Sequence, residues 1–460
     1  MAKRRGKARP RHSVGHPLPA APPRASVAAR LGEAVAVTAL VAVVVGTALL
    51  VDPGAHASFD APKRLVALAG ISIAAFAAFA LPLRLPGPFR AWRALPVSSR
   101  IAVVALAAGI VWAALSALLS PRRAASLDSF RALFLYALLL PLGASRTVGR
   151  HKGVLVAAFL GAAAVNAGVS LLQSRGIQPF RLQTFGARNE TGALAGNVGY
   201  LALSVALAAV ISLGIVLAST RPLPRVLAGA AFLLFLAALL VNRNLTAVLS
   251  LAAGGSVLLF TLFGRRALLP LSGALAVLLI AVFLYPPLAA RTGEAVRLVR
   301  AGEWDRLTTY RLGAWAAAAE MTRERPLFGF GPGTYGAEFV PHRLTAEIRA
   351  RRRYVNPLVT SSYSEAHSDY LQALAETGIP GGVAAIVSAG ALAVALLRKA
   401  AEPRVNRLEI AVLLGVLAAA AAAASTWFPL QRPITAVPLL LVAGRSWRLA
   451  AEAAPGPPPE

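Results

Sequence analysis

Apolar runs of about 18 to 22 residues recur along almost the whole chain, and they constrain its fold more than any other feature. Because a helix needs roughly 20 apolar residues to cross a bilayer, each run predicts a membrane-spanning helix. About twelve spans are expected, centred near residues 42, 74, 110, 136, 163, 205, 233, 254, 276, 390, 418 and 439. Hydrophobic residues make up 57% of the 460 residues and charged residues only 14%. The predicted fold class is therefore all-α, a polytopic helical membrane protein.

The cationic residues predict the orientation of the chain in the membrane. The chain has 47 Lys and Arg against 19 Asp and Glu, a net charge of +28. In a soluble protein this excess would suggest nucleic acid as a partner. Here the cations gather in the short segments between apolar runs, where orientation requires them, so we reject a nucleic-acid partner. The cluster of Lys and Arg before the first span predicts a cytoplasmic N-terminus.

These patterns divide the chain into five expected parts, of which one carries the function. They are a disordered basic cytoplasmic tail (1–30), membrane helices one to nine (31–285), one long extracytoplasmic catalytic loop with short helices (286–381), membrane helices ten to twelve (382–448), and a disordered cytoplasmic tail (449–460). Membrane insertion does not require the arginine, the lone histidine or the glycine-rich turn of the long loop. We therefore expect the functional site there.

The interiors of the apolar runs contain no Asp or Glu. A carrier coupled to protons or cations usually needs a carboxylate at mid-membrane depth, where the coupling ion is held. This favours an enzyme, while a non-enzymatic membrane carrier of a solute or lipid stays the competing class.

In the long loop, the segment 308–325 predicts a helix that is capped by Thr308 or Thr309 and ended by the proline that follows it. Arg311 and Trp315 are four residues apart and would share a face of this helix. The pair has two interpretations. It is either a cation–π anchor at the lipid headgroups or the start of a diphosphate site, for which the planar guanidinium is well suited.

Two further segments of the loop have local interpretations. Residues 329–333, Gly-Phe-Gly-Pro-Gly, predict a tight turn with positive φ at the glycines, and they lack the Lys-Ser/Thr of a nucleotide-binding P-loop. The basic run 349–353 is either a solvated or headgroup-facing surface or an attraction for anionic glycolipid. A metal site at Glu303 and Asp305 is not favoured, because no His or second carboxylate pair stands at ligand spacing. No cofactor is expected.

A second loop helix is predicted from about residue 363 to 377. Its start is a capping box from Ser362 to Glu365, and its end is Gly378 with a proline just beyond.

On that helix His367 would share an apolar face with Tyr370, while Asp369 and Glu376 would lie on the opposite face. His367 is then either a satisfied buried histidine or a general base in a dry site that faces the membrane domain. The same geometry predicts that Asp369 cannot orient the imidazole directly.

Two more arginines are expected on the same side of the membrane as His367. Arg188 precedes a polar segment, and Arg243 lies at a turn between two spans. Each could serve membrane orientation, or it could add to an anion site with Arg311.

The order of these motifs resembles the O-antigen ligase and polymerase superfamily of bacterial envelope glycosyltransferases, over about residues 180 to 445. The residues that carry the resemblance are Arg311, Trp315, the run 326–331 (Pro-Leu-Phe-Gly-Phe-Gly), the run 366–381 from Ala-His-Ser-Asp to Ile-Pro-Gly, and the run 428–433 (Phe-Pro-Leu-Gln-Arg-Pro). The segments around Arg188 and Arg243 are similar to weaker family motifs. The chain departs from the family at Ser368, where Asn is usual, and around Asn197, where the family has a Gly-Asn-Pro-Asn run.

The resemblance implies metal-independent transfer of a glycan, at the outer face of the bacterial inner membrane, from a polyprenyl-diphosphate-linked donor to a lipid, polysaccharide or protein acceptor. Membrane lipids surround such an enzyme. The implied catalytic residues are His367 as general base and Arg311. The implied diphosphate-binding residues are Arg243, Arg311 and Arg188. The implied supporting residues are Trp315, Asp369, Tyr370 and Glu376. Ligase and polymerase share these motifs, so both stay open.

Overall fold

The structure is a computed structural model that describes residues 27–55, 57–80, 92, 95–180, 190–273, 286–354, 363–402 and 405–452. Within these ranges every regular element is a helix, and eleven helices are long and apolar enough to cross a membrane. This confirms the all-α, polytopic membrane class. The predicted span centred near residue 276 lies outside the described residues.

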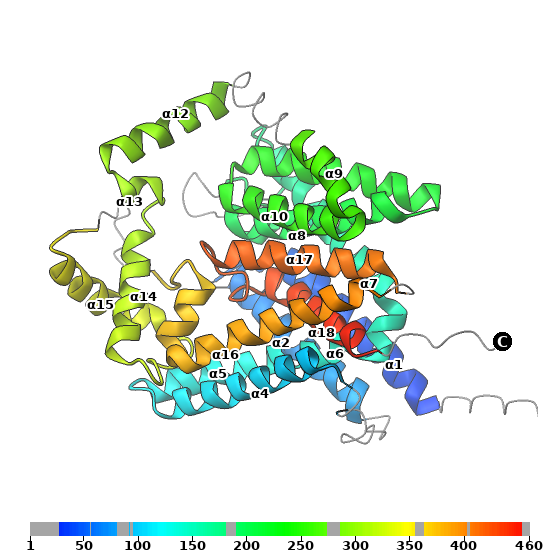
Figure 1. Cartoon of the computed structure of the whole chain (residues 1–460), viewed down its shortest axis with the longest axis horizontal. Helices are drawn as coiled ribbons and strands as arrows, with labels where there is room; N and C mark the ends of the chain where they lie inside the picture. Colours follow the sequence, from blue (N-terminus) through cyan, green and yellow to red (C-terminus); the bar gives the residue numbers. More distant parts are fainter. Residues whose placement is uncertain are drawn as a thin grey trace, which may run out of the picture.

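The first part of the chain supplies most of the bundle (Figure 1). Its helices are α1 (Val27–Leu49), α2 (Asp60–Ala75), α4 (Val97–Leu118), α5 (Arg123–Ala137), α6 (Leu139–Gly143), α7 (Arg146–Gln173), α8 (Val198–Ala218), α9 (Pro222–Asn242) and α10 (Leu245–Phe263). Helix α8 is the most enclosed of the spans because it is apolar on every face, and a helix of that kind belongs inside a bundle. The core of the protein is built around it.

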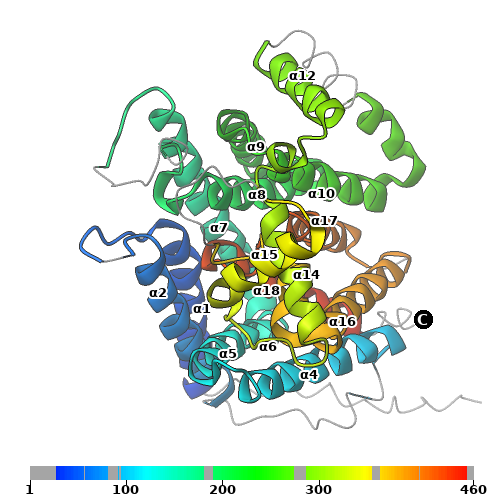
Figure 2. The same cartoon turned by 90° about the vertical axis from the view of Figure 1, so that its left-hand side faces the viewer.

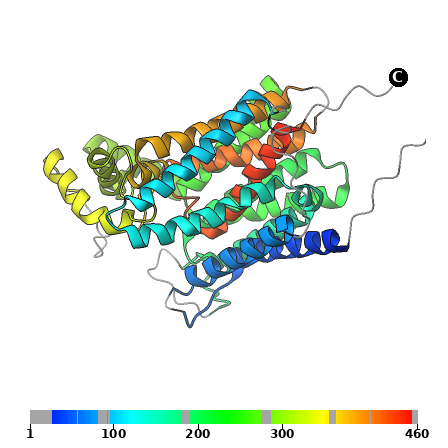
Figure 3. The same cartoon turned by 90° about the horizontal axis from the view of Figure 1, so that it is seen from below.

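After α10 the chain leaves the bundle and then returns. Four helices project from one end of the bundle, as Figures 1 and 2 show: α12 (Pro286–Ala301), α13 (Trp304–Leu307), α14 (Leu312–Glu324) and α15 (Tyr335–Ala350). Three helices then run back through it: α16 (Asp369–Ala400), α17 (Arg407–Ala424) and α18 (Pro433–Ala451). In Figure 3, α14 and α15 again lie beyond the end of the spans. We call this end of the molecule the loop end.

Glycines let the returning helices approach the first ones closely. A Cβ on Gly254 of α10 would stand 2.6 Å from the carbonyl oxygen of Gly415 of α17. Likewise, a Cβ on Gly444 of α18 would stand 2.1 Å from the oxygen of Leu140 of α6. Small residues at such crossings are typical of membrane bundles, where van der Waals packing replaces the hydrophobic effect between helices.

The helix predicted over 308–325 is shorter than expected. Helix α14 begins at Leu312, its N-cap is Arg311, and Thr309 and Tyr310 have φ values of 55° and 64°. The predicted cap at Thr308 or Thr309 is therefore wrong. The Thr308 hydroxyl instead donates 2.9 Å to the carbonyl oxygen of Trp304 and so closes the preceding helix α13. The predicted end is confirmed, because α14 stops at Glu324, just before the proline.

The helix predicted over 363–377 begins six residues late. Helix α16 starts at Asp369, and its N-cap is Ser368, whose hydroxyl accepts a hydrogen bond from the Leu371 amide. His367 precedes the helix with a φ of 54°, so the predicted helical face that it would share with Tyr370 is wrong. Ser362 lies outside the described residues.

The predicted helix end at Gly378 is confirmed. Gly378 has φ 73° and ψ 179°, so it breaks α16 into two helical parts. A Cβ at this position would stand 2.1 Å from the carbonyl oxygen of Leu327. Both the backbone conformation and the close approach therefore require glycine.

We expect Gly378→Ala to destabilise the protein by at least about 2 kcal/mol, because it combines a left-handed alanine with a backbone clash. The measurement is the apparent Tm of the detergent-solubilised protein. Gly390→Ala is the matched control, since Gly390 lies in the same helix and a Cβ there meets nothing within 4 Å. Equal Tm values for the two variants would contradict the expectation.

Candidate functional site

His367 is enclosed by three aromatic rings at the loop end. The rings of Tyr363, Trp427 and Phe428 lie 5.0, 5.3 and 5.1 Å from the imidazole, centre to centre. Each of them meets the imidazole nearly at a right angle, the edge-to-face arrangement that aromatic pairs favour. The half-buried imidazole is therefore largely shielded from water.

One hydrogen bond and one charge define the state of the imidazole. Nδ1 of His367 lies 3.1 Å from the carbonyl oxygen of Glu365, and because a carbonyl only accepts, Nδ1 carries the hydrogen. Burial, and next the positive charge of Arg311, lower the pKa of His367 from 6.5 to about 4, although the bond to Glu365 opposes this. At neutral pH the ring is thus uncharged, with the lone pair on Nε2.

Arg311 lies beside the same aromatic ring as the histidine. Its guanidinium carbon is 5.2 Å from the centre of the Trp427 ring, which is within cation–π range. Arg311 is the N-cap of α14, and its carbonyl oxygen accepts a hydrogen bond of 3.0 Å from the Trp315 amide. The indole Nε1 of Trp315 donates 3.3 Å to the carbonyl oxygen of His367. Helix α14 thus supplies both Arg311 and a tether for the histidine backbone.

Left-handed backbone is concentrated at these residues. His367, Arg243 and Tyr310, the neighbour of Arg311, have φ values of 54°, 48° and 64°. Non-glycine residues adopt this conformation at a cost, and the cost is commonly found at functional sites. Tyr310 is held by its amide, which donates to Asp305, and by its carbonyl oxygen, which accepts from the Tyr363 hydroxyl.

The turn between α17 and α18 carries Trp427. Of the predicted supporting residues, Asp369 binds this turn and Tyr370 binds the end of α17. Oδ2 of Asp369 accepts a hydrogen bond of 2.9 Å from the amide of Leu430, and the Asp369 amide donates to the Trp427 carbonyl oxygen. The Tyr370 hydroxyl donates 3.0 Å to the carbonyl oxygen of Ala421. These bonds place Asp369 and Tyr370 behind the site, where they support Trp427 rather than the imidazole.

Arg432 is a second buried guanidinium at the site, and sequence reasoning noted it only as part of a motif. It pairs with Asp60 at 2.9 Å and with Glu365, and its guanidinium carbon lies 4.8 Å from the centre of the Tyr200 ring. Its charge is balanced by two carboxylates, so its evident role is to join α2, α8 and the histidine segment. Although burial lowers the pKa of Arg432, Tyr200 and next Glu365 and Asp60 raise it above its ordinary value.

The glycine-rich turn is connected to the histidine segment through Glu376. The Glu376 carboxylate accepts hydrogen bonds from the amide of Tyr335, just after the turn, and from the side chain of Gln372. Gln372 in turn accepts a bond of 3.1 Å from the amide of Ala366, next to His367. The amide of Gly331 donates 2.7 Å to the Glu376 carbonyl oxygen. Glu376 therefore supports the site from behind.

The predicted tight turn is confirmed, since Gly329, Gly331 and Gly333 have φ values of 63°, 102° and 74°. Three residues that sequence reasoning missed bind the backbone at and just before this turn. Trp112 and Ser116 of α4, and Ser120 just after that helix, donate to the carbonyl oxygens of residues 327, 328 and 330. The Trp112 indole also stacks on the ring of Phe328, just before the turn, at 4.8 Å. The one sequence feature that could have found them is their spacing of four residues along an apolar span.

The other two arginines predicted at the site are Arg188 and Arg243. Arg188 lies outside the described residues. Arg243 is exposed at the C-cap of α9. Its turn reaches the Trp427 segment, because the hydroxyls of Thr246 and Thr426 lie 3.0 Å apart. Asn197, where the chain departs from the family, is a helix cap that accepts a bond of 2.7 Å from the Gly199 amide.

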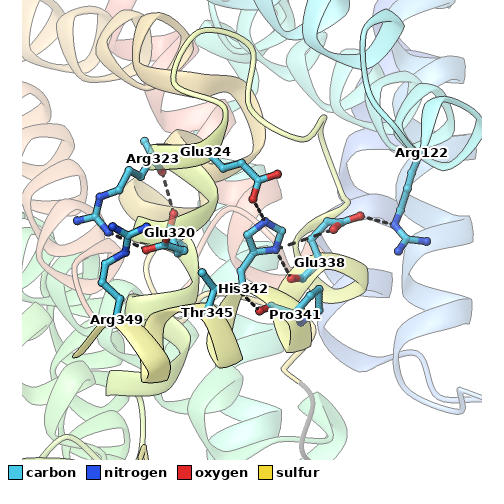
Figure 4. Close-up of polar contacts among 11 residues, drawn as sticks. Arg122, Glu320, Arg323, Glu324, Glu338, Pro341, His342, Thr345 and Arg349 are labelled. Carbon is cyan, nitrogen blue, oxygen red and sulfur yellow. Dashed lines mark hydrogen bonds and ion pairs between the residues drawn. The ribbon is translucent and has the colours of Figure 1, made fainter. Parts of the chain in front are cut away.

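Ion pairs from the end of α15 and just beyond it to α14 and α13 involve part of the basic run. Arg349 pairs with Glu320 at 2.8 Å, as Figure 4 shows, and Arg352 pairs with Asp305 at 2.6 Å. The arginine pairs of Glu320 also lower the pKa of that carboxyl, against the effect of burial. These two arginines therefore hold the loop helices together rather than forming a wholly solvated surface.

A second histidine of the loop end is a structural residue. Figure 4 shows His342 between Glu324, 3.1 Å from Nε2, and the backbone oxygen of Glu338, 2.6 Å from Nδ1. Arg122 binds the Glu338 carboxylate at 2.6 Å and so ties α15 to the spans. Both ring nitrogens of His342 have partners, in contrast to the arrangement around His367. Among the described residues, no group of three or more His, Asp and Glu is placed to hold a metal ion.

Comparison with known families finds a similarity in the central part of the chain. Residues 230–386 match the family model described as O-antigen ligase. The match runs from α9 into α16, so it contains Arg243, Arg311 and His367, whereas Trp427 and Arg432 lie outside it. A search of curated proteins gave no match.

Proposed function

We propose that this protein transfers a glycan from a polyprenyl-diphosphate carrier to an acceptor hydroxyl at the outer face of the bacterial inner membrane. The match of residues 230–386 to the O-antigen ligase family model supports membrane glycan transfer of the ligase or polymerase type, with lipid-linked glycans as substrates. The observation that carries the proposal is that a permanent cation, Arg311, and a neutral imidazole, His367, contact the same indole.

His367 is the general base of the proposed reaction. Its Nδ1–H bond to Glu365 leaves the lone pair on Nε2, which accepts the proton of the acceptor hydroxyl. The acceptor oxygen then bonds to the anomeric carbon of the donor sugar, and the bond from that carbon to the diphosphate oxygen breaks. The lowered pKa of His367, to which burial and the neighbouring guanidinium of Arg311 both contribute, keeps the base unprotonated at neutral pH.

Arg311 binds the diphosphate, with Arg243 and Arg188 as the further proposed ligands. The electron pair of the broken bond stays on the diphosphate, so its negative charge grows in the transition state. A guanidinium stabilises this charge with two parallel hydrogen bonds and never loses its own charge. The diphosphate is a good leaving group once it is neutralised in this way. A separate general acid is therefore not part of the proposal.

The supporting residues hold the backbone segments around Arg311 and His367. Trp315 binds the carbonyl oxygen of His367, and Asp369 binds the turn that carries Trp427. Tyr370 binds the end of α17, and Glu376 joins the glycine-rich turn to the histidine segment. They are positioning residues in the proposed reaction.

A blot of lipid-linked and mature surface glycan from a deletion strain tests this function. If the protein is a ligase, long unattached polymer is expected to accumulate on the lipid carrier and to disappear on complementation with the wild-type gene. A single repeat unit on the mature acceptor would instead assign the polymerase reaction of the same superfamily. A glycan profile unchanged by the deletion would overturn the proposal in favour of a carrier.

A further inference from the structure

Trp427 has no role in the proton transfer or in phosphate binding, and it lies outside the region that matches the family model. Yet both groups of the proposed reaction contact its ring. The guanidinium carbon of Arg311 lies 5.2 Å from the ring centre. The imidazole of His367 lies 5.3 Å away at an interplanar angle of 81°.

A sugar-stacking platform is the first explanation for a tryptophan at a glycan site, but the surroundings of this ring argue against it. Phe428 stacks on the indole at 4.7 Å with an interplanar angle of 15°, and Arg311 lies over it. The rings of His367 and Tyr200 stand beside it, the latter at 6.2 Å and tilted. The indole is therefore already engaged by protein groups.

We infer that Trp427 is a positioning residue that fixes Arg311 and His367 relative to each other. In this arrangement Arg311 can bind the diphosphate of the donor glycan while His367 takes the proton from the acceptor hydroxyl. This inference rests on the proposed function. Arg311 comes from α14 and His367 from the segment before α16. Trp315 and Tyr363 join the backbones of these two segments, whereas the Trp427 ring contacts both side chains. A group from a third segment that contacts both can set their separation.

Trp427 is itself held firmly enough to do this. Its carbonyl oxygen accepts from the amide of Asp369, and its neighbour Thr426 lies 3.0 Å from Thr246, hydroxyl to hydroxyl. The ring leaves no room on the side of α8, where a Cβ on Gly199 would stand 2.2 Å from a ring carbon of Trp427. Gly199 is therefore required for the observed position of the indole.

The position of the indole also governs the charge environment of the imidazole. The charged and titratable groups that face His367 are Arg311 from α14, Arg432 from the α17–α18 turn, and Tyr363 and Glu365 from its own segment, with Glu365 bound to Arg432. Removal of the indole takes away the ring contact of Arg311 and admits water beside the imidazole. The added hydration would raise the pKa of His367 from about 4 toward 6.5.

The first experiment compares Trp427→Leu and Trp427→Phe in a transfer assay on membranes with a defined lipid-linked glycan. Trp427→Leu is expected to lower kcat by about tenfold to a hundredfold, with a smaller effect on KM for the donor. The acid limb of its pH profile is expected to move up by about one to two pH units. Trp427→Phe retains an aromatic face and should recover part of the rate. Trp304→Leu, which removes a 45% exposed tryptophan of α13, is the control.

The second experiment moves the indole without removing any group. Gly199→Ala places a methyl group against the ring, so it should reproduce the loss of kcat and the pH shift of Trp427→Leu. Gly168→Ala, on α7, is the matched control because a Cβ there meets nothing within 4 Å. Amounts of inserted, folded protein are compared for all variants, and rates are expressed per folded molecule.

The outcomes separate this inference from the proposed function. If His367→Ala abolishes transfer while Trp427→Leu and Gly199→Ala keep the wild-type kcat and acid limb, the positioning role is overturned and the proposed function stands. If transfer survives in His367→Ala, the proposed function fails, whatever the indole does. A loss of kcat with an unshifted acid limb would show a merely structural role and would also overturn the inference.

Discussion

His367→Ala is expected to abolish glycan transfer, with a loss of about 10²- to 10⁴-fold in kcat, while the protein still inserts in the membrane. The imidazole is the proposed acceptor of the hydroxyl proton, and the nearby rings of Tyr363, Trp427 and Phe428 supply no replacement base. The fold should persist, because the bonds that hold this segment run through the Ala366 amide, the His367 carbonyl oxygen and the Ser368 hydroxyl, all of which the alanine variant keeps.

The assay is transfer from a lipid-linked donor, measured per inserted molecule. His151→Ala is the control, since it removes a histidine of α7 whose side chain, among the described residues, contacts the Thr147 carbonyl oxygen and Glu33. Undiminished transfer in His367→Ala would rule out the imidazole as the base.

The pH dependence of the wild-type protein provides a second test of His367 as the general base. Histidine is a base only when neutral, so a lowered pKa extends activity to lower pH. With the pKa of His367 near 4, kcat/KM should stay level from neutral pH to about pH 5 and fall around pH 4. An ordinary histidine would place this fall near pH 6.5. A fall near 6.5 would show that the imidazole is more hydrated than the structure has it.

Arg311→Ala is expected to lower kcat by about 10²- to 10³-fold, the usual loss when one group that stabilises transition-state charge is removed. The loss should be mainly in kcat, because the charge on the diphosphate grows only as the anomeric bond breaks. Arg311→Lys keeps the charge but loses the planar fork and the indole contact, so an intermediate rate is expected.

The matched control for this change is Arg323→Ala on the same helix. Arg323 pairs with Glu320 on the outside of α14 and is 58% exposed, so its loss should leave transfer almost unchanged. If Arg311→Ala kept the wild-type kcat and changed only KM for the donor, Arg311 would be a ground-state binding residue. The proposed stabilisation of the leaving diphosphate would then be wrong.

Local patterns were enough to predict the membrane class and several turns. The length of an apolar run decides whether a helix can cross a bilayer, and this is a property of consecutive residues. The positive φ of Gly329 and Gly331 and the break at Gly378 follow in the same way, because glycine tolerates conformations that other residues avoid. The grouping of Arg311 and His367 at one site came from the resemblance to a family.

Helix starts were less predictable, since a cap competes with tertiary contacts. Ser362 to Glu365 has the residues of a capping box, but the Glu365 side chain binds Arg432, and Ser368 caps the helix instead. This shift of six residues moved His367 out of the helix and changed which groups face it. The cap expected at Thr308 or Thr309 failed for a related reason, because the Thr308 hydroxyl bonds back to Trp304.

The sequence by itself determined that this is a polytopic helical membrane protein with a polar loop that carries an arginine and a histidine. Only the tertiary structure decided that Trp427, more than fifty residues after His367, stands between them. It also decided that Trp315 and Asp369 act on backbone groups. The physical reason is the distance along the chain over which each effect acts. Hydropathy and backbone conformation depend on a few consecutive residues. The site is assembled from α14, the segment before α16 and the α17–α18 turn, and local patterns do not encode which of these segments contact one another.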